Sequence, residues 1–127
     1  MILIVDDHKE TGAALERLLR YAGHEAVSVT CGAEALAMLH IRKPSLLILD
    51  VNMPNMDGLT VLRTIKAHEE LKDVSVAMYS SDTQHATMVE AMRLGAVDFL
   101  VKDTVGCDKL VARIGELAGR DGKGRHS

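Results

Sequence analysis

The sequence predicts an α/β protein with a five-stranded parallel sheet and helices on both of its faces. Five short apolar runs alternate with five stretches of helical spacing, which is typical of repeated strand–helix units. The run Leu46-Leu47-Ile48-Leu49 lacks the polar alternation of a half-exposed strand, so it is expected to be buried on both faces. A carboxylate, Asp50, follows it directly. Asp50 therefore lies at the carboxyl end of a strand. Proteins with parallel sheets bind their ligands at the carboxyl ends of the strands, so a functional site is expected beside Asp50.

Length and composition are those of one globular domain. The chain has 127 residues, 47% of them hydrophobic and 26% charged, which is enough for a single buried core. The net charge of −3 gives no field that would attract nucleic acid or a membrane surface, and no apolar run approaches the ~20 residues of a membrane span. The first strand begins at once and leaves no room for a signal peptide, so a cytoplasmic location is expected. Cys31 and Cys107 fit no metal spacing and are interpreted as free thiols.

In the first half, the expected elements follow one another as strand, helix, strand and helix. The first strand is a continuous apolar run that stops at the acidic pair Asp6-Asp7. The helix after it places leucines on one face, and Gly23 ends it. The second strand alternates between apolar and polar residues, which predicts an edge position in the sheet. The next helix presents Leu36 and Leu39 to the core. These elements are expected over residues 1–5, 8–22, 25–30 and 32–41.

In the second half, the central strand ends at Asp50 and leads into a loop with Pro54 and Gly58 as turn residues. Three helices and two strands then alternate. Gly95 ends the second of these helices, and the last strand ends at Lys102. These elements are expected over residues 58–68, 74–79, 83–94, 97–101 and 105–118. The domain is therefore expected to cover residues 1–118, with residues 119–127 as a disordered tail.

The pattern of the strands also predicts their order. The first and third strands are the most continuously apolar and belong in the middle, while the alternating second strand belongs at an edge. The order 2-1-3-4-5 satisfies both conditions, and it is the order of flavodoxin-like doubly wound folds. In this order the topological switch point, where the strand order reverses and ligands bind, lies between the first and third strands. Asp7 and Asp50 are thus expected on neighbouring strands, about 4.8 Å apart in the pairing direction.

Polar residues at four strand ends are expected to build one pocket. The carboxylates of Asp6, Asp7 and Asp50 would repel one another, and a divalent cation removes that conflict. Oxygen ligands suit Mg²⁺, with Mn²⁺ as an alternative ion. Ser80 adds a hydroxyl and Lys102 an ammonium at the ends of the next two strands. Acid, metal, hydroxyl and ammonium around one pocket are the components of a phosphoryl-handling site.

The histidines are expected to have no part in this pocket. His8 is expected to open the first helix. The others show no ligand spacing along the sequence and are expected to be surface residues: His24, His40, His68, His85 and His126.

Taken together, these motifs resemble the receiver domain of two-component response regulators over residues 1–118. Each motif alone is moderately specific, but the ordered set is highly specific. The resemblance is carried by Val5-Asp6-Asp7, by Leu49-Asp50-Val51-Asn52-Met53-Pro54 with Asp57-Gly58, by Ser80-Ser81, by Gly95-Ala96 and by Phe99-Leu100-Val101-Lys102.

The resemblance implies a phosphoacceptor and a metal site. Asp50 would accept the phosphoryl group. Asp7 and Asp50 would bind Mg²⁺ through their carboxylates, Asn52 would bind it through its backbone carbonyl, and Asp6 would support it through water.

The resemblance also implies a switch. Ser80 and Lys102 would contact oxygens of the phosphoryl group, and Phe99 would be the aromatic residue whose rotamer follows the hydroxyl. A histidine kinase or phosphotransfer protein would supply the phosphoryl group from a phosphohistidine. The fourth helix and fifth strand would then present a changed face to a downstream protein target or an output domain. The implied role is that of a signalling domain rather than an enzyme, and a monomer or weak dimer through the fourth helix, fifth strand and fifth helix is expected.

Three further positions set two expectations of their own. The family usually has proline after the lysine, whereas this chain has Asp103, and a trans Lys102–Asp103 bond is expected because a cis bond before a non-proline residue costs ~2.5–4 kcal/mol. The resemblance also implies that Asn52 and Asp82 occupy the positions that flank the path of a hydrolytic water. Because both are short and polar, a phosphorylated state lasting seconds to minutes is expected.

Two other functions are weaker alternatives. A Mg²⁺-dependent phosphohydrolase with an aspartyl-phosphate intermediate typically needs a second acid two residues after the nucleophile, where this chain has Asn52. A flavin-binding electron carrier of the same fold needs phosphate donors after the first strand, where this chain has Asp6 and Asp7. Whether the domain acts alone or with an output domain stays open.

Overall fold

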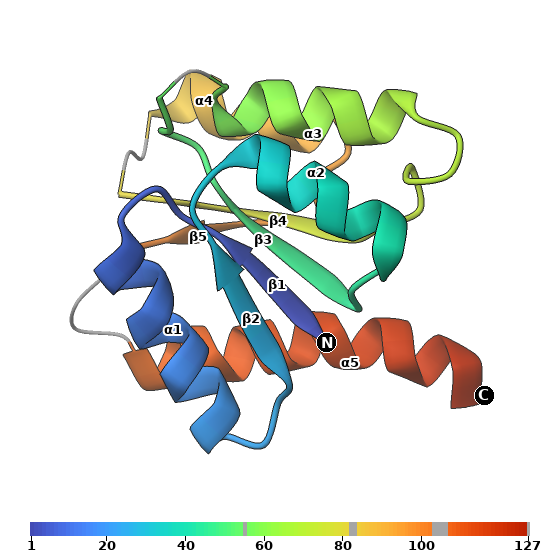
Figure 1. The fold of residues 1–127 in the computed structure, drawn as a ribbon. Coiled ribbons are helices and arrows are strands. Elements are labelled where there is room, and N and C mark those ends of the chain that lie inside the picture. The colour runs from blue at the N-terminus through green and yellow to red at the C-terminus, as the bar shows by residue number, and fades with distance from the viewer. Residues whose placement is uncertain (55, 82–83, 103–106, 127) are drawn as a thin grey trace.

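The computed structural model describes residues 1–54, 56–81, 84–102 and 107–126, with the backbone alone at 107 and 120–126. Strands and helices alternate strictly along the chain (Figure 1). The strands are β1 (Ile2–Val5), β2 (Ala26–Val29), β3 (Leu46–Asp50), β4 (Val76–Ser80) and β5 (Asp98–Val101). The helices are α1 (Lys9–Tyr21), α2 (Gly32–Ile41), α3 (Gly58–Ala67), α4 (His85–Arg93) and α5 (Cys107–His126).

The five strands form one parallel sheet in the order β2-β1-β3-β4-β5, which confirms the predicted flavodoxin-like fold. All residues of β1 and β3 are buried, whereas the two middle residues of the edge strand β2 are half-buried, as its alternating pattern predicted. The register pairs Val5 with Leu49. The acidic residues that follow these two positions, Asp6 and Asp50, therefore leave the sheet side by side.

The sheet separates two hydrophobic cores. Alternate residues of a strand point to opposite faces, so Leu47 and Leu49 pack in one core and Leu46 and Ile48 in the other. The first core lies under α2, α3 and α4, and the second lies under α1 and α5, on the other side of the sheet (Figure 1). Both cores end at the carboxyl edge of the sheet, where the polar residues begin.

The loop after β3 is held against the strand by a close backbone approach. The N–H of Gly58 donates a hydrogen bond to the carbonyl oxygen of Val51 at 2.8 Å. A Cβ at position 58 would lie 2.1 Å from the carbonyl oxygen of Asp50, so only glycine fits there. The Asp57 side chain caps α3 by accepting a 2.8 Å hydrogen bond from the N–H of Thr60. This arrangement fixes the backbone on which Asp50 sits.

Two predicted boundaries are wrong in instructive ways. Ser80 was expected just after the fourth strand, but it is the last residue of β4, because its carbonyl accepts a 2.8 Å hydrogen bond from the N–H of Lys102, the residue that follows the neighbouring strand β5. The last helix was expected to end at Ala118, whereas α5 continues to His126. Each residue added to an existing helix gains a backbone hydrogen bond, which offsets the ~1 kcal/mol that a glycine costs. None of the helices in the described part of the chain has the length and apolar character needed to span a bilayer.

Candidate functional site

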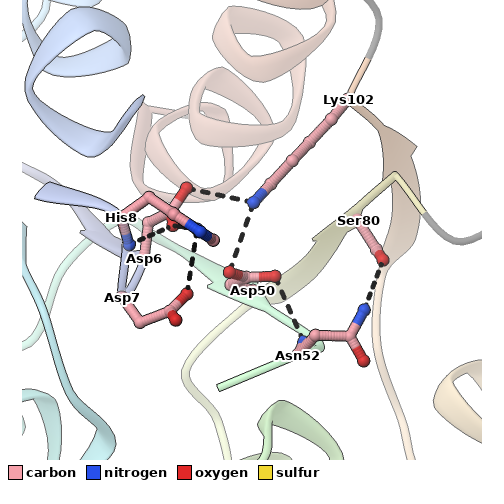
Figure 2. Close-up of polar contacts among 7 residues, drawn as sticks. All are labelled: Asp6, Asp7, His8, Asp50, Asn52, Ser80 and Lys102. Atoms are coloured by element: carbon pink, nitrogen blue, oxygen red, sulfur yellow. Dashed lines mark hydrogen bonds and ion pairs between the residues drawn. The ribbon is translucent and has the colours of Figure 1, made fainter. Parts of the chain in front are cut away.

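The polar ends of β1, β3, β4 and β5 meet at the carboxyl edge of the sheet (Figure 2). Of the residues described, the buried polar or charged ones are Asp6, Asp50 and Ser80, with exposed fractions of 0%, 2% and 0%. All three belong to this cluster. Burial of polar groups is costly unless they are paired, so their gathering at one sheet edge indicates a functional site.

Lys102 lies between two of the acids. Its Nζ is 3.1 Å from Asp6 Oδ2 and 3.2 Å from Asp50 Oδ2, and it also lies 4.9 Å from the centre of the Tyr79 ring. Burial lowers the pKa of Lys102, but the charge of Asp50 and the hydrogen bond and charge of Asp6 outweigh burial and raise it above its ordinary value. Lys102 is therefore held as an ammonium, and the prediction that it lies beside Asp50 is met by the geometry.

Even with Lys102 beside it, the Asp50 carboxyl group is harder to ionise than an ordinary aspartate. Burial raises its pKa, the Lys102 charge lowers it, and the Asp6 charge raises it again, to about 6 overall. The N–H of Asn52 donates to Asp50 Oδ1 at 3.2 Å and favours the charged form. An additional positive charge near this carboxylate would restore its ionisation.

The acidic cluster fits a hard divalent cation. Asp6, Asp7, His8 and Asp50 each place one ligand atom within 4.8 Å of the others. Asp7 Oδ1 and Asp50 Oδ2 are buried and accept no hydrogen bond from the described residues, although the second faces the Lys102 ammonium. Asp6 is more engaged, because its Oδ1 accepts the N–H of His8 at 2.9 Å and its Oδ2 pairs with Lys102. The carboxylates with capacity for a directly bound ion are thus Asp7 and Asp50.

His8 lies closer to the cluster than the sequence suggested. It precedes α1 as expected, and its side chain makes no capping hydrogen bond. Its Nδ1 lies 3.3 Å from Asp7 Oδ1 and 3.6 Å from Asp6 Oδ1. The signal in the sequence was simple adjacency to Asp6-Asp7, which also occurs in many ordinary helix starts.

Of the other predicted residues, Asn52 contacts Asp50, Ser80 contacts Asn52, and Phe99 lies on β5. Asn52 is exposed, and its Nδ2 donates to Ser80 Oγ at 3.5 Å (Figure 2). Phe99 is half-buried and packs against the core under α2, α3 and α4. Two predicted features, the Asp82 side chain and the Lys102–Asp103 bond, lie outside the described residues.

Comparison with known proteins agrees with this geometry. The profile of the response regulator receiver domain matches residues 2–115. The transcriptional regulatory protein PrrA of Mycobacterium tuberculosis is 38% identical over 121 residues, which cover 95% of this chain and 51% of PrrA. The chemotaxis protein CheY of Pseudomonas aeruginosa is 35% identical over 102 residues, which cover 80% of this chain and 82% of CheY. This chain thus spans about half the length of PrrA but most of CheY.

Solved structures agree as well. The receiver domain of NtrX from Brucella abortus superposes with a TM-score of 0.83 at 30% identity, covering 94% of this chain and 98% of that domain. The response regulator Rcp1, whose structure is of a Mn²⁺-bound form, superposes with a TM-score of 0.80 at 25% identity, covering 91% of each chain. From the fold, the strand-end cluster and these matches together, the chain belongs to the response regulator receiver domains, the phosphoryl-accepting signalling domains of two-component systems.

Proposed function

We propose that Asp50 is the residue that accepts the phosphoryl group in this receiver domain. The observation that supports this most directly is the position of its carboxylate. It is buried at the end of β3, with the Lys102 ammonium 3.2 Å from one oxygen and the Asn52 N–H 3.2 Å from the other. Asp6 and Asp7 lie beside it but would serve other roles. Asp6 is already bonded through both oxygens, and Asp7 makes no ion pair with Lys102 in the described part of the chain.

The same cluster would hold a metal ion. Asp7 and Asp50 offer carboxylate oxygens, Asn52 would add its backbone carbonyl, and Asp6 would act through a water molecule. The all-oxygen ligand set suits Mg²⁺, with Mn²⁺ as the alternative. A bound ion would neutralise charge on the carboxylates and on the phosphoryl oxygens.

The reaction would be an in-line transfer. An Asp50 oxygen attacks phosphorus, the O–P bond forms as the N–P bond of the donor phosphohistidine breaks, and the released imidazole takes a proton from solvent. Lys102 would neutralise one phosphoryl oxygen, and the Ser80 hydroxyl would donate to another. These residues supply orientation and charge stabilisation, which are the main protein contributions to phosphoryl transfer. A histidine kinase or a phosphotransfer protein is the proposed donor.

The signal would leave the site through Ser80 and Phe99. Met78 pairs in register with Phe99, and Ser80 lies two residues after Met78, so Ser80 and Phe99 belong to the same face of the sheet. Movement of Ser80 toward the phosphoryl group would open space that Phe99 can enter. The face of α4 and β5 next to Phe99 would then change for a downstream protein target or an output domain.

We infer that the unphosphorylated domain is a monomer or a weak dimer through α4, β5 and α5. Exposed apolar side chains mark this face: Val89, Met92, Val97 and Val101. Its charges are paired within one copy, because Arg113 Nε lies 2.7 Å from Asp98 Oδ2 and Arg93 binds Glu90. Charges already paired in one chain give a second copy little to bind. Sedimentation equilibrium should report a monomer at micromolar concentration, and a tight dimer would contradict this inference.

The central test is intact-mass analysis after incubation with acetyl phosphate and Mg²⁺. The wild type should gain the mass of one phosphoryl group, and Asp50→Asn should gain none. Asp57→Asn is the matched control, because Asp57 is an exposed carboxylate in the same loop that faces α3 instead of the cluster. Loss of labelling in both variants, or in neither, would refute Asp50 as the acceptor.

A further inference from the structure

A second group of metal-ligating side chains lies where α2 and α3 end. Both helices start at the carboxyl edge of the sheet, where Asp50 lies, and run side by side to the opposite edge (Figure 1). His40 belongs to the last turn of α2, His68 is the C-cap of α3, and Glu70 follows in the next turn. These residues show no ligand spacing along the sequence, since 27 positions separate His40 from the next member of the group.

The three side chains are close enough to share one ion. Each offers a ligand atom that lies within 4.8 Å of the other two. His40 Nδ1 is 3.9 Å from Glu70 Oε2, and the rings of His40 and His68 meet edge to face with their centres 5.1 Å apart. Small rotations of exposed side chains would bring these atoms to the separations that a metal requires.

We propose that His40, His68 and Glu70 bind a divalent transition-metal ion of the Zn²⁺ type, with water in the remaining position. Two imidazole nitrogens and one carboxylate oxygen are a ligand set that suits Zn²⁺ and not Mg²⁺, which takes oxygen ligands. The single carboxylate also offsets part of the charge of the ion. The bound ion would link the C-terminal ends of α2 and α3.

The backbone holds two of the three ligands in place. The carbonyl oxygen of His68 accepts hydrogen bonds from the N–H groups of Leu71 and Lys72 at 3.0 and 2.9 Å, which fixes the turn containing Glu70. The N–H of Glu70 donates to His68 Nδ1 at 3.2 Å and orients the ring. Metal binding would either displace that N–H from Nδ1 or move the ring proton to Nδ1. In both cases the Glu70 N–H loses its hydrogen bond to the ring and binds water instead. Because Glu70 is exposed, the cost in free energy is small.

Access and local charge also favour an ion. The side chains of His40 and Glu70 are 46% and 73% exposed, so an ion reaches them without a change of the fold. Lys72 lies in the same turn, but its Nζ is 3.0 Å from Glu69 Oε1 and is thereby neutralised.

The site can be tested separately from the acidic cluster at Asp50. Zn²⁺ is titrated calorimetrically into the protein in the presence of about 10 mM Mg²⁺, which competes for the oxygen-rich cluster and not for imidazole pairs. One saturable Zn²⁺ site is expected. His40→Ala and His68→Ala should each weaken binding at least about tenfold, and Glu70→Gln should weaken it by a smaller factor. His85→Ala, which removes an exposed histidine from α4, should leave binding unchanged.

A stability measurement gives an independent readout. At free Zn²⁺ about 100 times the dissociation constant, the Tm of the wild type should rise by roughly 10 °C, and that of His68→Ala should not. Two outcomes would overturn the proposal. One is the absence of saturable Zn²⁺ binding in the presence of Mg²⁺. The other is binding that His8→Ala abolishes while His40→Ala and His68→Ala retain it, which would place the ion in the acidic cluster.

Discussion

Lys102 Nζ lies 3.2 Å from Asp50 Oδ2, so an ammonium at the end of the edge strand β5 faces the carboxylate at the end of the central strand β3. The same ammonium contacts Asp6 Oδ2 at 3.1 Å, and Asp6 is fully buried. One cation therefore balances two acids whose burial would otherwise be strongly unfavourable.

Replacing Lys102 with methionine should destabilise the metal-free protein. The change keeps the aliphatic stem but leaves Asp6 and Asp50 without their cation, so the pKa of Asp50 should rise further above about 6. A loss of about 2–3 kcal/mol in the free energy of unfolding is expected at pH 8 in chelator, measured by urea denaturation. Lys72→Met is the control, because its exposed pair with Glu69 should change stability by less than about 1 kcal/mol. Equal losses in the two variants would contradict the role assigned to Lys102.

The stability of the metal-free protein should depend on pH through Asp50. Burial raises the pKa of Asp50 in the folded state from 3.8 to about 6, so the folded protein holds this proton more tightly than the unfolded chain does. This tighter proton binding contributes about 3 kcal/mol to the free energy of unfolding. The contribution is fully present below about pH 4 and is lost as the pH rises through about 6.

Asp50→Asn removes this contribution. Denaturation in chelator across pH 4–8 should therefore show the wild type losing stability relative to Asp50→Asn as the pH rises, whereas Asp57→Asn should follow the wild type. A constant difference between wild type and Asp50→Asn over this range would show that Asp50 ionises in the folded protein without a penalty.

Gly58 should be intolerant of even one added methyl group. A Cβ there would meet the Asp50 carbonyl oxygen at 2.1 Å and the Val51 Cα at 2.9 Å, and both are backbone atoms that cannot turn away. Gly58→Ala should lower the free energy of unfolding by about 3 kcal/mol and shift the backbone of Asp50. Gly12→Ala is the matched control within a helix, since its Cβ would make only ordinary contacts at 3.5 Å and should raise stability by about 0.5–1 kcal/mol. Thermal unfolding of both variants decides the point.

The strand order and the main cluster could be predicted because they depend on local patterns. Leu46 to Leu49 show burial on both faces by their lack of alternation, and parallel strands bring their polar ends to one edge whatever the details of packing. What could not be predicted depends on register and on helix packing. The contact of Lys102 with Asp6 as well as Asp50 follows from the register of the strands. The meeting of His40 with His68 follows from the way α2 and α3 lie together, which apolar periodicity does not determine.

Magnesium should stabilise the fold through Asp7. Asp7 Oδ1 is buried and accepts no hydrogen bond from the described residues. Its ion-pair contact is with the exposed ring of His8, whose Nδ1 lies 3.3 Å away and can turn aside, so an ion at this position gains a ligand at little cost. Mg²⁺ at millimolar concentration should raise the Tm of the wild type by a few degrees and leave that of Asp7→Ala unchanged. Asp108→Ala, which removes an exposed acid from the first turn of α5, should respond as the wild type does. The same response to Mg²⁺ in Asp7→Ala as in wild type would exclude Asp7 as a ligand.

The lifetime of the phosphorylated state should be set by how easily water reaches the phosphoryl group. Asn52 lies two positions beyond Asp50, and its exposed side chain donates from Nδ2 to Ser80 Oγ at 3.5 Å. A short amide at this point should leave the approach to Asp50 open and should hydrogen-bond an incoming water molecule. Asp82, two positions beyond Ser80, is equally short and polar, although its placement lies outside the described residues. A wild-type lifetime of seconds to minutes is therefore expected.

Longer or basic side chains at these two positions should protect the acyl phosphate. Asn52→Met removes the amide and covers the approach, and Asp82→Arg adds a long cation that can lie over the phosphoryl group. The double variant should lose its phosphoryl group at least about tenfold more slowly, which is about 1.4 kcal/mol in the barrier to hydrolysis. The measurement is the decay of phosphorylated Asp50 by intact mass after removal of the donor. His85→Arg is the control, because it adds a similar charge at the start of α4 and should not change the rate. If the wild type retains its phosphoryl group for hours, or if the double variant decays at the wild-type rate, Asn52 and Asp82 do not control the access of water.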